Sequence, residues 1–320
     1  MSLATLPLAA SNALDAGASL WALLAALVVA MLALDLLVFA RRGAPSLRAS
    51  AAWSVGWLVV ALGFGAALWA WHGSDAGAEY LAGYLLERSL SLDNVFVFAV
   101  ILGYFAVPLP VQAKVLSWGI MLALVLRLVF ILLGAALLDA AHVTFYAFGA
   151  LLLYTAWKLA RHDGEKVEPE RNPALRALRR LVPMSRDYHG DRLVMRAGGG
   201  RMATPLLAVF VVVATTDVVF AVDSVPAIFA VTQAPFIVFA ANAFAMVGLR
   251  ALYFLLAGMM DRFAYLSHGL AAILAFIGVK MLLIDVWHPP IWISLAVIAG
   301  VLAVTAALSL RADTPTRGEA

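Results

Sequence analysis

The chain has 320 residues and a formal net charge of +3, with 64% hydrophobic and only 13% charged residues. Soluble domains have roughly 25% charged residues, so this composition and the mean hydropathy of +0.96 indicate a polytopic membrane protein. The small basic excess does not suggest a nucleic-acid partner. Because cysteine is absent, a disulfide framework and a thiolate metal site are excluded.

Apolar stretches follow one another along the chain, and each is long enough for a membrane-spanning helix at about 1.5 Å per residue. There are nine: 18–40, 51–71, 80–104, 113–138, 143–160, 203–232, 235–258, 264–284 and 290–309. The predicted fold class is therefore an all-α polytopic membrane protein. No basic residue precedes Arg41, so the first stretch is expected to remain as an anchor rather than to act as a cleaved signal.

Lysine and arginine gather on one side of this nine-span arrangement. The longest basic segment is 161–202, and the connections on the opposite side, at 72–79, 139–142, 233–234 and 285–289, contain neither residue. Basic segments stay in the cytoplasm. We therefore expect the N-terminus on the outer side of the membrane and the C-terminus on the cytoplasmic side.

An internal repeat is carried by acidic residues inside apolar spans. Glu87 and Asp93 lie six residues apart in ERSLSLDNVFVF. The same spacing recurs 130 residues later at Asp217 and Asp223, within TTDVVFAVDSVPAIFAVT. Three spans separate the two copies, an odd number, so spans three to five and six to eight are expected to form an inverted repeat.

This repeat divides the chain into five expected segments. They are a two-helix segment at 1–79, the first three-helix repeat at 80–160, the basic cytoplasmic loop at 161–202, the second repeat at 203–284, and the last helix with the tail at 285–320.

Inverted repeats place their substrate site near the membrane midplane, where the two copies meet. The candidate metal ligands are Glu87, Asp93, Asn94, Asp217, Asp223 and Ser224, with Asp35 and Asn242 as accessory residues. All of them offer oxygen, which suits hard cations such as Mn²⁺, Mg²⁺ or Ca²⁺ better than Zn²⁺ or Cu⁺. Residues six apart differ by about 120° around a helix, so both acids of one copy can face one site only if the helix bends. Pro226 favours such a bend.

Arginines also lie within the spans, in the matching stretches LRLVFILLG and LRALYFLLAG. Arg127 and Arg250 either neutralise a carboxylate permanently or occupy the site while it is empty, as counter-ions that the substrate releases. Arg88, which adjoins Glu87, is expected to point elsewhere, toward the membrane surface. The four main acids outnumber these two deep arginines, and a buried excess of negative charge is costly without a cation or protons.

These motifs resemble the TerC/Alx family of bacterial membrane proteins, which is named for tellurium resistance and alkaline induction. MLALDLLVF at 31–39 and FIGVKMLLID at 276–285 add to the resemblance, which covers about 18–310. It implies manganese export or tolerance across the inner membrane of a bacterium, so that the N-terminus would be periplasmic and the C-terminus cytoplasmic. The acids that it implicates are Glu87, Asp93, Asp217 and Asp223. Close relatives often carry Glu where this chain has Ala214, so the site here would have one charge fewer.

We therefore expect a secondary transporter that exports a divalent cation, Mn²⁺ foremost, with protons as the candidate coupling ion. Its partners would be this substrate and the lipid bilayer, and the sequence leaves the oligomeric state open. No bound cofactor and no enzymatic activity are expected: an intramembrane aspartyl protease needs a Gly-Asp context that the four acids lack. The alternative is a membrane scaffold that recruits a metal or tellurite stress-response complex through 161–202.

Overall fold

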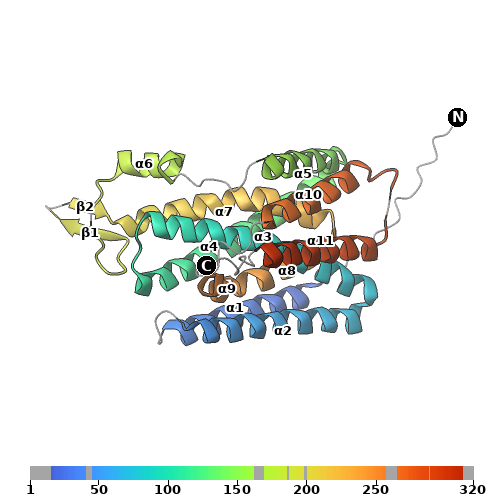
Figure 1. Cartoon of the computed structure of the whole chain (residues 1–320), viewed down its shortest axis with the longest axis horizontal. Helices are drawn as coiled ribbons and strands as arrows, with labels where there is room; N and C mark the ends of the chain where they lie inside the picture. The colour runs from blue at the N-terminus through green and yellow to red at the C-terminus, as the bar shows by residue number, and fades with distance from the viewer. Residues whose placement is uncertain are drawn as a thin grey trace, which may run out of the picture.

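A computed structural model of the chain shows a bundle of long helices (Figure 1). The described residues are 16–40, 45–161, 169–185, 187–197, 200–256, 265–287 and 289–312. The strands among them form a single antiparallel hairpin.

The helices lie lengthwise beside one another, and the hairpin projects from one end of the bundle (Figure 1). In chain order the elements are α1 (Ala18–Ala40), α2 (Leu47–His72), α3 (Ser74–Tyr104), α4 (Leu109–Ala140), α5 (Val143–Arg161), a 3-10 turn (Pro169–Arg171), α6 (Pro173–Leu181), β1 (Val194–Ala197), β2 (Gly200–Ala203), α7 (Pro205–Phe229), α8 (Pro235–Val247), α9 (Leu249–Leu256), α10 (Leu266–Leu282) and α11 (Ile291–Ala312).

The predicted all-α membrane architecture is confirmed, whereas the count of nine spans stays a prediction. Within the described ranges, six helices are long and apolar enough to cross a membrane, and α8 with α9 makes a seventh if this pair, bent by 41°, is one span. The other two expected spans are also helical. However, α3 carries several charged residues, and α10 has only 17 residues.

Four helices form the centre of the bundle: α3, α4, α7 and α8. Here α3 packs on α8 and α7, while α4 packs on α7 and α8. The pair α1 and α2 covers one side, and the closely packed pair α5 and α10 covers the other (Figure 1). Finally, α11 lies against α3 and α10.

Local sequence signals explain several helix ends. Asn172 accepts hydrogen bonds from the first amides of α6, and Ser46 does the same for α2. Prolines occupy the first positions of α7 and α8, where the missing amide hydrogen costs nothing. Gly73 separates α2 from α3 with a φ of 92°, a conformation that glycine adopts without strain.

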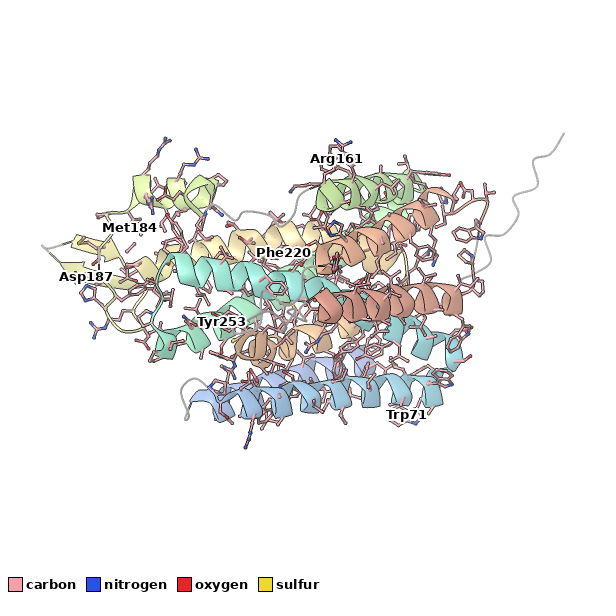
Figure 2. All side chains as sticks on the ribbon, in the orientation of Figure 1. Trp71, Arg161, Met184, Asp187, Phe220 and Tyr253 are labelled. Carbon is pink, nitrogen blue, oxygen red and sulfur yellow. The ribbon has the colours of Figure 1, made fainter. Side chains whose placement is uncertain are left out.

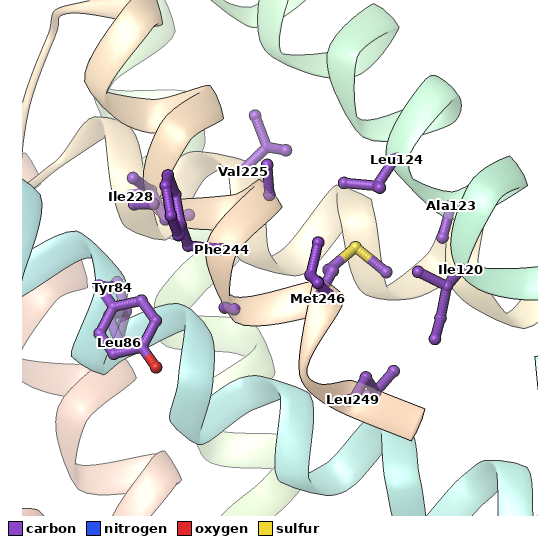
Figure 3. Close-up of a cluster of buried hydrophobic side chains, with 14 of the residues drawn as sticks. Tyr84, Leu86, Ile120, Ala123, Leu124, Val225, Ile228, Phe244, Met246 and Leu249 are labelled. Atoms are coloured by element: carbon purple, nitrogen blue, oxygen red, sulfur yellow. The ribbon is translucent and has the colours of Figure 1, made fainter. Parts of the chain in front are cut away.

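The centre of the bundle is held by close packing of apolar side chains (Figure 3). Met246 and Phe244 of α8 are buried in the same cluster as Leu124 of α4, Ile228 of α7 and Tyr84 of α3. This cluster fixes how the central helices are rotated about their axes, and so decides which polar residues face one another.

The outer faces of the helices are apolar, as lipid contact requires. Val29, Val59 and Val125 are each more than half exposed on α1, α2 and α4. Trp71, which Figure 2 labels at the end of α2, is 78% exposed, in the position of an interfacial aromatic residue. Exposed apolar surface of this extent marks a membrane-facing protein.

A close backbone approach joins α5 to α10. A Cβ atom added to Gly149 would lie 3.0 Å from the carbonyl oxygen of Gly278, and a Cβ added to Gly278 would lie 3.0 Å from that of Gly149. The flanking contacts are reciprocal too: Gly149 faces Leu282, and Gly278 faces Leu153. Each helix therefore uses a glycine and a leucine four residues later in the same way.

Candidate functional site

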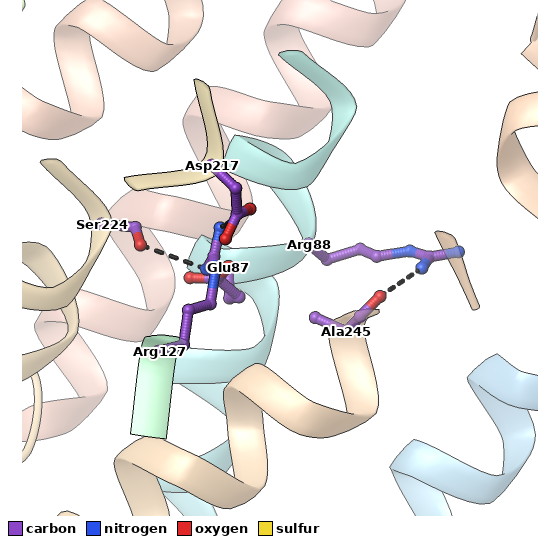
Figure 4. A network of polar contacts seen from close by, with 6 residues as sticks. All are labelled: Glu87, Arg88, Arg127, Asp217, Ser224 and Ala245. Carbon is purple, nitrogen blue, oxygen red and sulfur yellow. Dashed lines mark hydrogen bonds and ion pairs between the residues drawn. The ribbon is translucent and has the colours of Figure 1, made fainter. Parts of the chain in front are cut away.

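The buried polar centre of the molecule is built around Arg127 of α4. Its guanidinium reaches between α3 and α7, and its Nη1 forms an ion pair and hydrogen bond with Glu87 Oε1 (Figure 4). Arg127 Nη2 lies 3.8 Å from Asp217 Oδ1. One cation thus joins an acid from each copy of the repeated motif.

Two neutral oxygen donors complete the surroundings of this guanidinium. Arg127 Nη1 donates to Ser224 Oγ at 3.2 Å. With the Asn94 amide oriented so that its oxygen faces the arginine, that oxygen accepts from Arg127 Nη2 at 3.1 Å, and the amide nitrogen donates to the Leu90 carbonyl at 3.2 Å. The structure therefore gathers four of the six predicted ligands around one arginine side chain.

The centre is sealed from solvent, and it carries more negative than positive charge. Glu87 and Arg127 are 0% exposed and Asp217 is 1% exposed. When ionised, two carboxylates face a single guanidinium. Glu87 Oε2 and both Asp217 carboxylate oxygens accept no hydrogen bond from the described residues. Buried, unsatisfied carboxylate oxygens are costly, and a second cation or a proton would relieve that cost.

Asp93 and Asp223, the other two predicted acids, are not among the contacts of Arg127. Asp223 instead accepts a hydrogen bond from Thr155 of α5 at 3.0 Å. Across the described ranges, no group of three or more His, Asp or Glu side chains is arranged to hold a metal ion. Because α3 and α7 continue as helices through both acids, residues six apart point in different directions, and only one acid of each pair contacts Arg127.

Pro226 lies inside α7 without ending the helix. A proline has no amide hydrogen, so the carbonyl four residues earlier, that of Val222, loses its intrahelical donor. This carbonyl adjoins Asp223 in the chain. A backbone oxygen without its intrahelical donor therefore lies close to Ser224 in the chain.

Arg250, the sequence counterpart of Arg127, has different partners. Its Nη2 lies 2.7 Å from Asp35 Oδ2 of α1 and also donates to the Asp35 carbonyl oxygen. Its Nη1 donates to Ser117 Oγ of α4 at 2.5 Å. Asp35 and Arg250 are 4% and 2% exposed, so this is a second buried ion pair. The accessory residue Asp35 thus belongs to Arg250 rather than to the centre around Arg127.

Arg88 does not reach toward the membrane surface as expected. Its Nη1 donates to the carbonyl oxygen of Ala245 in the last turn of α8 at 3.0 Å (Figure 4). A Cβ atom added to Gly248 would lie 3.0 Å from the same nitrogen. A cation at a helix C-terminus compensates the partial negative charge of the last carbonyls. Arg88 therefore stabilises the end of α8, at the break before α9. No pattern in the sequence indicates this role.

Asn242, the other accessory residue, lies on α8 and is 1% exposed. Neither its amide oxygen nor its amide nitrogen has a hydrogen-bond partner among the described residues. Buried amide groups without partners are uncommon. Asn242 is therefore a polar group that this conformation leaves unsatisfied.

The connection between α5 and α7 is anchored to the bundle at several points. Asn172 Nδ2 donates to Thr215 Oγ1 of α7 at 2.8 Å, and the Tyr188 hydroxyl donates to the Phe105 carbonyl at 2.7 Å. Lys114 of α4 forms an ion pair with Asp191 and holds the pKa of that carboxyl below its ordinary value of 3.8.

The amino-acid sequence of this chain is similar to those of other membrane proteins. Residues 72–317 match the family model described as "Integral membrane protein TerC family". An uncharacterised membrane protein of Myxococcus xanthus is 44% identical over 292 residues, covering 91% of this chain and 92% of that protein. The "Putative membrane-bound redox modulator Alx" of Escherichia coli K12 is 44% identical over 298 residues, covering 89% of this chain and 92% of that protein. No solved structure matches the chain.

Proposed function

The chain belongs to the TerC family of integral membrane proteins, and from this premise we propose that it exports a divalent metal cation through the centre formed by Glu87, Arg127 and Asp217. The favoured substrate is Mn²⁺, and the favoured setting is the inner membrane of a bacterium, with the N-terminus in the periplasm. The observation that carries the proposal is a pair of fully buried carboxylates that share one arginine and retain unsatisfied oxygens.

The chemistry of the centre supports a hard cation. Its donors are carboxylate, hydroxyl and amide oxygens, and the chain has no cysteine. Oxygen donors select Mn²⁺, Mg²⁺ or Ca²⁺ over softer metals. Ionisable residues at membrane depth are rare, and they mark the paths of ions and protons. Because Arg127 lies among these oxygens, a divalent substrate has to displace its guanidinium in order to bind there.

The packing of the bundle supports an inverted repeat of α3–α5 with α7–α10. In that repeat α3 corresponds to α7, α4 to α8 with α9, and α5 to α10. The contact of α3 with α8 then has its counterpart in the contact of α7 with α4. The corresponding helices α5 and α10 also pack closely on each other, with their backbones approaching at Gly149 and Gly278.

Transport by the purified protein tests the proposal directly. Vesicles that contain the protein and a trapped metal-sensitive dye should show Mn²⁺ movement, and Glu87→Gln or Asp217→Asn should reduce its rate about tenfold or more. Asp139→Asn, which changes an exposed acid on α4, is the matched control and should leave the rate unchanged. Failure of the unmodified protein to move Mn²⁺, Mg²⁺, Ca²⁺ or Zn²⁺ would overturn the proposal.

A second candidate function follows from the name of the relatives, which describes a membrane-bound redox modulator. A role of that kind by thiol exchange has no residue to carry it here, because the chain lacks cysteine. The second candidate function is therefore that of a membrane scaffold, which would bind its partners through the basic connection at 161–202. Replacing exposed residues of α6 such as Arg179 and Arg180 would separate the two, because export should persist while a scaffold would lose its partner.

A further inference from the structure

The centre around Arg127 has a symmetric set of donors and an asymmetric occupant. Glu87 corresponds to Asp217 at a separation of 130 residues, and Asn94 corresponds to Ser224 at the same separation. All four surround the guanidinium of Arg127. The donors therefore come as two equivalent pairs from α3 and α7, whereas the arginine comes from only one copy of the repeat.

The equivalent arginine of the other copy is held away from this centre. Arg250 contacts Asp35 of α1 and Ser117 of α4. Ser117 lies ten residues before Arg127 on the same helix, which corresponds to about 15 Å along α4. Since α1 lies outside the repeat, Asp35 has no counterpart that could hold Arg127 in the same way.

The helices that carry the two arginines also differ between the copies, because one is continuous and the other is broken. Arg127 lies within α4, which is unbroken from Leu109 to Ala140. Arg250 follows directly after the 41° bend between α8 and α9. The continuous helix thus inserts its arginine into the centre, while the broken helix holds its arginine back. Two copies of one motif in two conformations are what an inverted repeat uses to open alternately to the two sides of a membrane.

We propose that Arg127 and Arg250 take turns as the counter-ion of Glu87 and Asp217, and that Asp35 is the positioning residue that holds Arg250 out of the centre in the present conformation. In the opposite conformation α8 and α9 straighten, Arg250 enters, and α4 bends to withdraw Arg127. This inference rests on the proposed export function and its inverted repeat. The substrate cation occupies the centre between the two arginine-bound conformations.

Electrostatics gives a reason for this exchange. Two buried carboxylates without a cation are energetically costly in either conformation of the transporter. A tethered arginine from each copy would supply that cation in both conformations. One arginine together with a divalent ion would bring three positive charges to two carboxylates, so entry of the substrate would favour withdrawal of the arginine.

Distance measurements between spin labels test the exchange without relying on transport. The chain has no native cysteine, so Phe254→Cys on α9 and Val55→Cys on α2 give a single labelled pair. The pair should show two distances, and Asp35→Asn should raise the share of the minor one about tenfold. If Asp35→Asn fails to elute as a monodisperse protein, Ser117→Ala, which removes another contact of Arg250, is measured in its place. An unchanged distribution in the folded variant would overturn the exchange.

Measurements of the transport rate distinguish the exchange of the arginines from the proposed export function. Arg250→Gln should still bind Mn²⁺ but lose at least about tenfold in transport rate, and Arg250→Lys should restore part of the rate. If the unmodified protein transports Mn²⁺ and Arg250→Gln transports equally well, the exchange is wrong while the export function stands. If the unmodified protein transports no divalent cation, the export function is wrong, and the label distances alone decide whether the arginines exchange.

Discussion

Gly149 of α5 and Gly278 of α10 face each other so closely that a Cβ on either residue would lie 3.0 Å from the other's carbonyl oxygen. We predict that Gly149→Ala and Gly278→Ala each lower the free energy of unfolding by about 1–3 kcal/mol through overpacking, and by similar amounts. Thermal unfolding in detergent micelles measures this. Gly63→Ala on α2 is the control, because a Cβ added there would meet no atom within 4 Å and alanine favours a helix. Clearly unequal effects would show that the two glycines are not packed equally tightly.

The ion pair of Arg127 with Glu87 predicts non-additive stability effects. Arg127→Gln leaves two buried carboxylates without their cation, so it should destabilise the protein by about 3–5 kcal/mol. Adding Glu87→Gln removes one of those charges and should recover a large part of the loss. A double-mutant cycle of unfolding free energies checks this. Additive losses would show that the two side chains do not interact.

Asp217 and Asp223, which are six residues apart, should differ in how much each contributes to the transport rate. Asp217 approaches Arg127, whereas Asp223 accepts from Thr155. We expect Asp217→Asn to reduce Mn²⁺ transport in vesicles several-fold more than Asp223→Asn, because only the first changes the charge next to Arg127. Thr155→Val serves as the control for loss of the Thr155 hydrogen bond alone. Equal effects of the two Asn variants would place both carboxylates in one site.

Lys114 and Asp191 predict a pH effect at the hairpin end of the bundle. The pKa of the Asp191 carboxyl lies below 3.8 because Lys114 stabilises its charged form. The stabilisation by this pair is thus present above pH 3.8 and is lost as the pH falls through the lowered pKa. Hydrogen exchange of the segment 187–197 should therefore speed up below that pKa. Asp191→Asn should already show the faster exchange at neutral pH, and identical exchange in both proteins would contradict the prediction.

The sequence predicted the helices well, because apolar length is a strong signal, and the structure buries Glu87 and Asp217, two of the four candidate acids. It could not decide which of two acids six residues apart faces the centre, since this depends on how packing rotates α3 and α7. The stretch 235–258 was expected to form one span, but the described part bends by 41° at Gly248. A lone glycine is a weak sign of a break.

Long-range partners were beyond the sequence for a different reason. Arg250 binds Asp35, which lies 215 residues away, and Arg88 binds the Ala245 carbonyl, 157 residues away. Neither partner shares a motif or a spacing with its arginine. Only the packing of α1 on α8 and α4, and of α3 on α8, brings these groups together.

The hydrogen bond from Asn172 to Thr215 joins the segment before α6 to α7, two residues before Asp217. Leu175 of α6 is fully buried beside it. A partner protein that binds α6 would therefore exert force on the same helix that carries the buried carboxylate. Such binding would change ion passage by moving α7 through the basic connection. Recruitment of a partner and export of an ion would then depend on the same mechanical linkage.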